Sequence, residues 1–316
     1  MKYEYEKFGL VNTRDMFADA LRGGYAVPAF NFFNLENLQA IASAAADTRS
    51  PVILAVSESA LKYMGAAVCV AMVESVIRGR GIRAALHLDH GHSLAACRDA
   101  IDSGFSSVMI DGSALSFDEN VELSRSVVDY AGNFGVSVEA ELGALAGIED
   151  ENTRNEVGFY TNPDDVVKFV GATGCDSLAV AVGTSHGAYK RRNDAEELRF
   201  DILDEIARRL PDFPLVLHGA SNIPENLVAE INRFGGRLGD ARGIPADQIR
   251  RATAMNVCKV NVDSDSRLAW FAAARELFAN APENYDPRVP LAAARQKMRD
   301  LYVWEIENIM GSGVDK

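Results

Sequence analysis

Short runs of β-forming residues alternate along the whole chain with longer stretches of helical period, and no other feature constrains the fold as strongly. Eight such runs occur, at residues 26–30, 51–56, 84–88, 107–110, 136–142, 177–182, 215–217 and 257–262. This alternation is typical of βαβ units and of a parallel sheet. Because eight successive right-handed crossovers curl back on themselves, the pattern favours a closed (β/α)8 TIM barrel over a doubly wound open sheet.

Two segments lie outside this alternation. Residues 290–310 have the apolar spacing of an extra C-terminal helix, which we expect to dock on its own barrel or on a second subunit. Residues 143–162 are rich in Gly, Asp and Glu and have no clear period, so we interpret them as a mobile loop over the functional site. A chain of 316 residues suits one barrel with a few additional helices, and we expect a single domain over residues 1–316.

Composition and charge exclude several classes of protein. A hydrophobic fraction of 48% is enough for a large buried core and predicts a soluble globular protein. The net charge of -13 argues against nucleic acid or an anionic membrane as partner, because both require clustered Lys and Arg. No apolar stretch reaches the roughly 18 residues of a spanning helix, and the charged N-terminus lacks the apolar core of a signal peptide. Four scattered cysteines without a C-x-x-C pair favour reduced thiols, so we predict a cytoplasmic location.

Three of the five histidines, His90, His186 and His218, stand at or shortly after the ends of predicted strands. The carboxyl ends of barrel strands share one face, so these rings are expected to converge. Three imidazoles with one open coordination position form a catalytic zinc site. One strand-end histidine alone is as often structural, but three together favour metal binding, whereas His87 and His92 are expected to be structural or to support the ligands.

Asp89 directly precedes His90 and has two interpretations. Its carboxylate can orient a neighbouring histidine or cap the following helix. It can also act as a general acid or base beside a metal ligand, and the sequence favours this role slightly.

Glycines and short polar side chains after the later strands predict anion binding. Gly187 and Gly219 allow a phosphate to approach backbone N–H groups, and Ser221 adds a hydroxyl donor. A second polar group, where barrels often build a phosphate site, consists of Asn261, Ser264 and Arg267. The alternative is that these residues form ordinary turns and helix caps, with Arg267 as a solvated helix residue. Lys190, four residues after His186, is a further basic candidate, and its alternative is a surface loop lysine.

These motifs together resemble the class II, metal-dependent fructose-bisphosphate aldolases, on the branch shared with tagatose-bisphosphate aldolases. The resemblance covers nearly the whole chain and is carried by Ala-Val-Pro-Ala-Phe-Asn at 26–31, Gly-Phe-Ser-Ser-Val-Met-Ile-Asp-Gly-Ser at 104–113 and Lys-Val-Asn-Val-Asp at 259–263. It implies Zn2+ on His90, His186 and His218. It also implies that Asp89 moves the proton at the hydroxyl where the carbon–carbon bond breaks.

The resemblance assigns further roles that spacing alone does not. Asp111 and Glu141 match a second, displaced metal site, and Glu149 in the predicted mobile loop matches the base for the ketone carbon. A monovalent cation, Na+ or K+, is implied near Gly187 and Gly219. The residues implied in substrate and phosphate binding are Asn31, Ser57, Gly187, Lys190, Gly219, Ala220, Ser221, Asn261, Val262, Asp263, Ser264 and Arg267.

The predicted function is reversible cleavage of fructose 1,6-bisphosphate to dihydroxyacetone phosphate and glyceraldehyde 3-phosphate through an enediolate, by a homodimer or homotetramer. Asp263 resembles the fructose-type members, and a tagatose-bisphosphate or other ketose-bisphosphate aldolase is the alternative. A Schiff-base enzyme would use a lysine such as Lys259, which we instead expect to be structural or to lie near the phosphate. A metal-dependent hydrolase is disfavoured because the first strand has no H-x-H pair, and a phosphosugar-binding barrel without turnover is disfavoured by the presence of Asp89 and Glu149.

Overall fold

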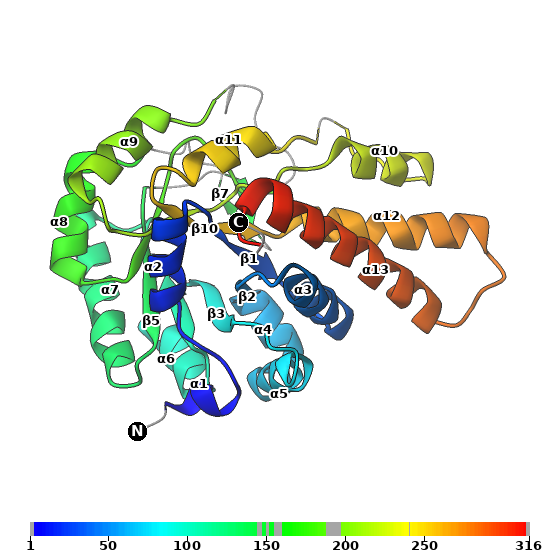
Figure 1. The fold of residues 1–316 in the computed structure, drawn as a ribbon, viewed down its shortest axis with the longest axis horizontal. Coiled ribbons are helices and arrows are strands. Elements are labelled where there is room, and N and C mark those ends of the chain that lie inside the picture. Colours follow the sequence, from blue (N-terminus) through cyan, green and yellow to red (C-terminus); the bar gives the residue numbers. More distant parts are fainter. Residues whose placement is uncertain are drawn as a thin grey trace.

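The computed structural model describes residues 3–143, 147–149, 152–154, 160–187, 197–239 and 241–313. Within these residues a parallel sheet closes into a barrel with the strand order β1-β10-β9-β8-β5-β4-β3-β2. The barrel closes because β1 pairs with both β2 and β10, which lie beside it in Figure 1. The strands are β1 (Val27–Asn31), β2 (Val52–Ser57), β3 (Ala84–Gly91), β4 (Ser107–Ile110), β5 (Ser137–Leu142), β8 (Ser177–Val180), β9 (Leu215–Leu217) and β10 (Val257–Val262). The predicted TIM barrel is confirmed, and the open-sheet alternative is wrong.

Helices follow the strands around the outside of the barrel. Asn34 and Ser93 accept hydrogen bonds from the backbone N–H groups of Asn37 and Ala96 and are the N-caps of the helices that follow β1 and β3. The helices are α1 (Glu4–Lys7), α2 (Arg14–Gly23), α3 (Leu35–Thr48), α4 (Glu58–Met64), α5 (Ala66–Ile77), α6 (Leu94–Asp102), α7 (Phe117–Gly132), α8 (Pro163–Thr173), α9 (Phe200–Arg209), α10 (Glu225–Arg233), α11 (Ala246–Ala252), α12 (Ser264–Asn280) and α13 (Arg288–Glu305).

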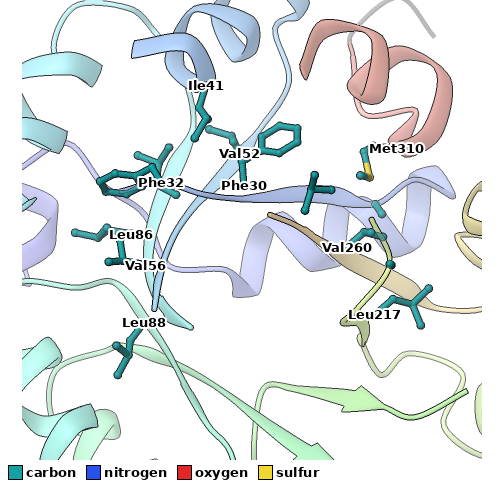
Figure 2. Packing of buried hydrophobic residues seen from close by; sticks show 14 of the residues in the cluster. Phe30, Phe32, Ile41, Val52, Val56, Leu86, Leu88, Leu217, Val260 and Met310 are labelled. Carbon is teal, nitrogen blue, oxygen red and sulfur yellow. The ribbon is translucent and has the colours of Figure 1, made fainter. Parts of the chain in front are cut away.

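Side chains alternate between two apolar regions along each strand. One set, including Phe30, Val56 and Leu86, packs between the strands and the surrounding helices (Figure 2). The other set points into the barrel, where Ile53 and Ala85 belong to a small cluster with Phe17 of α2. Because residues two apart on a strand share a face, this register also directs the polar residues further along the strands toward the barrel interior.

The third strand continues beyond its predicted end. The prediction ended it at Leu88, whereas β3 includes Asp89 and His90 and reaches Gly91. His90 has a φ of +48°, in the left-handed region, and the register with β4 shifts between Leu88 and Gly91. This irregularity aims successive polar side chains at the end of the barrel instead of alternating them across the sheet.

The predicted C-terminal helix forms and docks on its own barrel. It is α13, which contacts α3 and α12, followed by a π-helical turn at Ile306–Met310 (Figure 1). Tyr302 is fully buried, its ring centroid lies 4.3 Å from that of Phe30, and its hydroxyl accepts a 2.6 Å hydrogen bond from the Asn37 side chain. The helix thus anchors itself through a polar contact inside an apolar interface.

Residues 143–162 contain secondary structure that their lack of period did not predict. The strands β6 (Gly147–Glu149) and β7 (Asn152–Arg154) pair antiparallel in a separate two-stranded sheet. Elsewhere in the described ranges, no single helix is long and apolar enough to cross a membrane, and α4 with α5 meets that composition only as a pair bent by 89°.

We expect Tyr302→Phe to lower the free energy of unfolding by about 1–3 kcal/mol, because the buried Asn37 amide loses its acceptor. Urea denaturation of the variant and the parent chain measures this difference. Tyr285→Phe is the matched control, since Tyr285 is 96% exposed and its change should have no effect. Equal midpoints for Tyr302→Phe and the parent would contradict a stabilising role for this contact.

Candidate functional site

Polar side chains from four barrel strands meet at the carboxyl end of the barrel. Asn31 comes from β1, Asp89 and His90 from β3, Glu141 from β5 and Asn261 from β10. His218 follows β9 directly. These residues are spread along the chain from position 31 to position 261, and the closure of the barrel brings them together.

Asp89 is held by two amide side chains. Its Oδ2 accepts a 2.7 Å hydrogen bond from Asn31 and its Oδ1 accepts a 2.8 Å bond from Asn261. Burial opposes ionisation of this carboxyl, but the electrostatic influence of His90, His218 and Lys259 outweighs burial and holds the pKa of Asp89 below its usual range. The side chain is therefore an oriented carboxylate at neutral pH, and it does not cap the following helix, whose N-cap is Ser93.

His218 is oriented from behind by a buried carboxylate. Its Nε2 lies 2.8 Å from Glu139 Oε1, and Glu139 also accepts hydrogen bonds of 2.8 and 3.0 Å from Lys259. Burial raises the pKa of Glu139, but Lys259 and His218 outweigh this effect and lower it to about 2. Since the ionised carboxylate only accepts hydrogen bonds, His218 carries its proton on Nε2 and directs the lone pair of Nδ1 toward the site.

One ring nitrogen of His90 faces a carboxylate, and the other faces His218. Its Nδ1 lies 3.1 Å from Asp111 Oδ2 and 3.7 Å from Glu141 Oε2, while its Nε2 lies 2.7 Å from Nδ1 of His218. The Asp111 contact places the proton of a neutral His90 ring on Nδ1. Two imidazole lone pairs then face each other at 2.7 Å, an arrangement that a shared cation stabilises.

The donor atoms form two overlapping groups that could hold a metal ion. One consists of Asp89, His90 and His218, and the other of His90, Asp111 and Glu141, and within each group the atoms lie within 4.8 Å of one another. His186 stands beside the first group, with its ring centroid 5.2 Å from that of His90 and 6.2 Å from that of His218. The nitrogen donors of the three rings and the carboxylates beside them fit a divalent transition metal.

The other two histidines lie outside both donor groups. His87 is buried, with Nδ1 2.8 Å from Ser107 Oγ and Nε2 3.3 Å from Lys259 Nζ. Burial and the charge of Lys259 lower the pKa of His87 to about 3, so the ring is neutral. His92 is half-exposed and its backbone N–H donates to Glu58. Their structural or supporting roles stay predictions.

The predicted anion-binding glycines occupy backbone conformations that favour glycine. Gly219 has a φ of +59°, and a Cβ there would lie 2.6 Å from the Ser185 backbone. Gly187 has a φ of +82°. Ala220 and Ser221, which follow Gly219, are buried. The loop after β9 is therefore packed directly against the segment after β8, as a shared anion site requires.

The last predicted group lies where β10 passes into α12. Asn261 and Val262 belong to β10, Asp263 is the N-cap residue of α12, and Ser264 begins the helix. Arg267 Nη2 lies 2.8 Å from Asp263 Oδ2, and its side chain is 46% exposed. In this structure Arg267 thus pairs with a residue of its own helix terminus.

Three further predicted residues differ in how far the structure describes them. Ser57, at the end of β2, accepts a 3.3 Å hydrogen bond from the Ala60 N–H and caps α4. Glu149 is described only through its backbone in β6, and Lys190 lies outside the described residues.

Known proteins match the chain over nearly its whole length. The family model for class-II fructose-bisphosphate aldolase matches residues 11–313. The chain belongs to this family. The fructose-bisphosphate aldolase of Treponema pallidum (strain Nichols) is 51% identical, with 98% of each chain covered, and that of Giardia intestinalis is 44% identical, with 96% of this chain and 94% of the relative covered. The crystal structure of the YdjI aldolase from Escherichia coli K12 matches with a TM-score of 0.77 at 28% identity and covers 96% of this chain and 98% of that one.

Membership of the class-II aldolase family confirms the predicted family and enzyme class. It also implies a divalent metal ion, for which the donor groups around His90 are suited. Sequence reasoning gave Glu139 no role in this aldolase site, although it contacts a predicted metal ligand. The sequence could have indicated a role for Glu139 through its spacing of two residues from Glu141, because this spacing places both carboxylates on the inner face of β5.

We expect the double variant Glu139→Leu with Lys259→Met to fold but to bind Zn2+ about 10- to 100-fold more weakly. Removing both charges together leaves no unpaired buried ion, whereas His218 loses the acceptor that fixes its proton on Nε2. Competition with a chromophoric chelator measures the affinity, and circular dichroism checks the fold. Unchanged affinity in the folded variant would show that Glu139 does not orient His218.

Proposed function

We propose that this chain is a zinc-dependent aldolase that reversibly cleaves fructose 1,6-bisphosphate to dihydroxyacetone phosphate and glyceraldehyde 3-phosphate. The observation that carries the proposal is the contact between two oriented imidazoles, His90 and His218, beside a carboxylate that two amides hold in place. Such a carboxylate next to a metal position is the combination that proton transfer and ketone activation require. The names of the relatives support the choice of fructose 1,6-bisphosphate.

His90, His186 and His218 would hold the metal, and their nitrogen donors favour Zn2+. The bound metal supplies a Lewis acid that polarises the ketone of the substrate. Asp111 and Glu141 would hold a second, displaced position, since both lie beside Nδ1 of His90. A monovalent cation, Na+ or K+, near Gly187 and Gly219 is part of the proposal.

Asp89 would take the proton from the hydroxyl at the carbon where the bond breaks, and return it in the condensation direction. Its ionised state at neutral pH suits the cleavage step, because only the carboxylate accepts this proton. Asn31 and Asn261 keep both carboxylate oxygens in a fixed orientation, which lowers the entropic cost of reaching the reactive geometry. Glu149 is proposed as the base at the ketone carbon.

The two phosphate groups of the substrate would be bound locally, in spite of the net charge of -13. The proposed phosphate residues lie in the loops after β8 and β9 and at the start of α12. Backbone N–H groups for contact with a phosphate would come from Gly187, Gly219, Ala220 and Ser221. The basic side chains proposed for the same role are Lys190 and Arg267.

A Schiff-base mechanism on Lys259 is disfavoured by the surroundings of this lysine. Its side chain is fully buried and its Nζ donates to both oxygens of Glu139. An ammonium group held in this way is neither neutral nor accessible to a ketone. This arrangement supports the metal-dependent reaction.

A homodimer or homotetramer and a cytoplasmic location complete the proposal. Exposed aromatic side chains on α12 and α13, Phe271, Phe278 and Trp304, support self-association. The four cysteines are free and buried, which supports a reducing compartment.

We expect Asp89→Asn to keep the metal and to slow cleavage by about 10²- to 10⁴-fold, because the amide cannot accept the substrate proton. His90→Ala should instead lose stoichiometric zinc together with turnover, while the fold persists. Metal analysis and steady-state kinetics on the same samples measure both effects. Parent-like turnover of Asp89→Asn, or stoichiometric zinc in His90→Ala, would contradict the assigned role of that residue.

Fructose 1,6-bisphosphate should be cleaved faster than tagatose 1,6-bisphosphate, in a coupled assay that a chelator abolishes and Zn2+ restores. Borohydride with dihydroxyacetone phosphate should leave no covalent adduct on the protein. Faster cleavage of the tagatose isomer would favour the alternative aldolase. Binding of the sugar bisphosphate without cleavage in the zinc-loaded protein would favour a phosphosugar-binding barrel.

A further inference from the structure

The loop at residues 219–223, between β9 and α10, is held in one shape by two neighbouring loops. On one side, Gly219 lies against the Ser185 backbone. On the other, Gly243 approaches so closely that a Cβ there would lie 1.9 Å from the Asn222 carbonyl oxygen. The Ile244 N–H donates a 3.0 Å hydrogen bond to Ser221. A side chain at Gly219 or at Gly243 would clash with the neighbouring backbone. The two glycines therefore allow the close approach of these loops.

The third attachment of this loop is a buried carboxylate from α12. Asp265 has no exposed surface, and its Oδ2 accepts a 2.7 Å hydrogen bond from the Asn222 N–H. Its Oδ1 accepts another 2.7 Å bond from the N–H of Ile223. One side chain therefore binds two successive peptide groups, next to the residues proposed to contact phosphate.

The conformation held by Asp265 is one that the loop would not adopt by preference. Ile223 has a φ of +54°, a conformation that is unfavourable for a β-branched residue. Hydrogen bonds from both Asn222 and Ile223 to an ionised carboxylate offset this cost, because such bonds are stronger than neutral ones. Without the carboxylate, Ile223 would return to a more favourable backbone conformation. This change would also move Ser221 and Ala220, which precede it in the same loop.

A second buried carboxyl, that of Glu305, lies beside Asp265. Glu305, at the end of α13, is also fully buried. Burial and the charge of Asp265 raise the pKa of Glu305 well above its usual range. Neutral Glu305 therefore adds no second negative charge next to the carboxyl group that receives the two backbone N–H groups.

We propose that Asp265 is a positioning residue for phosphate binding, holding residues 219–223 in the shape that presents Gly219, Ala220 and Ser221 to a phosphate group of the substrate. This inference rests on the proposed aldolase function. Asp265 itself lies behind the loop and makes no contact with the substrate in this assignment. Its removal should weaken binding of phosphate-bearing ligands while sparing the chemical step at Asp89 and the metal.

The test is Asp265→Asn, which keeps the shape but turns one acceptor into an amino group facing a backbone N–H. The KM for fructose 1,6-bisphosphate should rise at least tenfold and the inhibition constant of inorganic phosphate should rise in parallel. The kcat should stay within threefold of the parent, and the zinc content should be unchanged. If Asp265→Asn does not fold, Asp265→Ser, which suits the first turn of a helix, should give the same rise in KM.

Asp176→Asn is the matched control. Asp176 precedes β8 at the opposite end of the barrel, where it accepts a 2.8 Å hydrogen bond from the Val138 N–H and pairs with Arg14. A carboxylate with only a structural role should lower the melting temperature without raising KM, as we expect for this control. An unchanged KM in Asp265→Asn, or an equal rise in both variants, would overturn the role of Asp265. A parent protein that binds zinc but cleaves no ketose bisphosphate would instead contradict the proposed function.

Discussion

The buried ion pair between Glu139 and Lys259 is the interaction on which the rest of the site depends. Both side chains lie inside the barrel with almost no exposure, so each loses its hydration on folding at a cost of about several kcal/mol. Only a closed barrel in the correct register brings His87 and His218 to the same pair. A slip of one residue in β10 would turn Lys259 toward the helices, where no partner compensates its charge.

This constraint gives the barrel two functional layers. Glu139 and Lys259 occupy the inner layer, and residues two positions further along the same strands, Glu141 and Asn261, occupy the outer one. The inner layer fixes the proton of His218, and the outer layer carries the groups around Asp89 and His90. The charges that specify the fold therefore also orient His218, a proposed metal ligand.

Much of this arrangement could be predicted from the sequence, because strand-forming runs bounded by turn residues are local signals. The bounds of β4 and β9 agree with the predicted runs. The extension of β3 could not be predicted, since it depends on the left-handed φ of His90 and on where β4 resumes pairing. The contact of Asp265 with Asn222 joins residues far apart in the sequence, so no local pattern reveals it. The pairing of β6 with β7 is local, but these three-residue strands are too short to show a period.

The left-handed backbone at His90 limits how this site could change in evolution or in the laboratory. Asn, Asp and Gly adopt a φ near +48° more readily than β-branched residues do. Trading this imidazole for another donor is therefore easiest through Asn or Asp, whose oxygens prefer harder cations than zinc. If His90 holds the metal as proposed, the bend in a single strand thus restricts which metals a descendant of this protein could adopt.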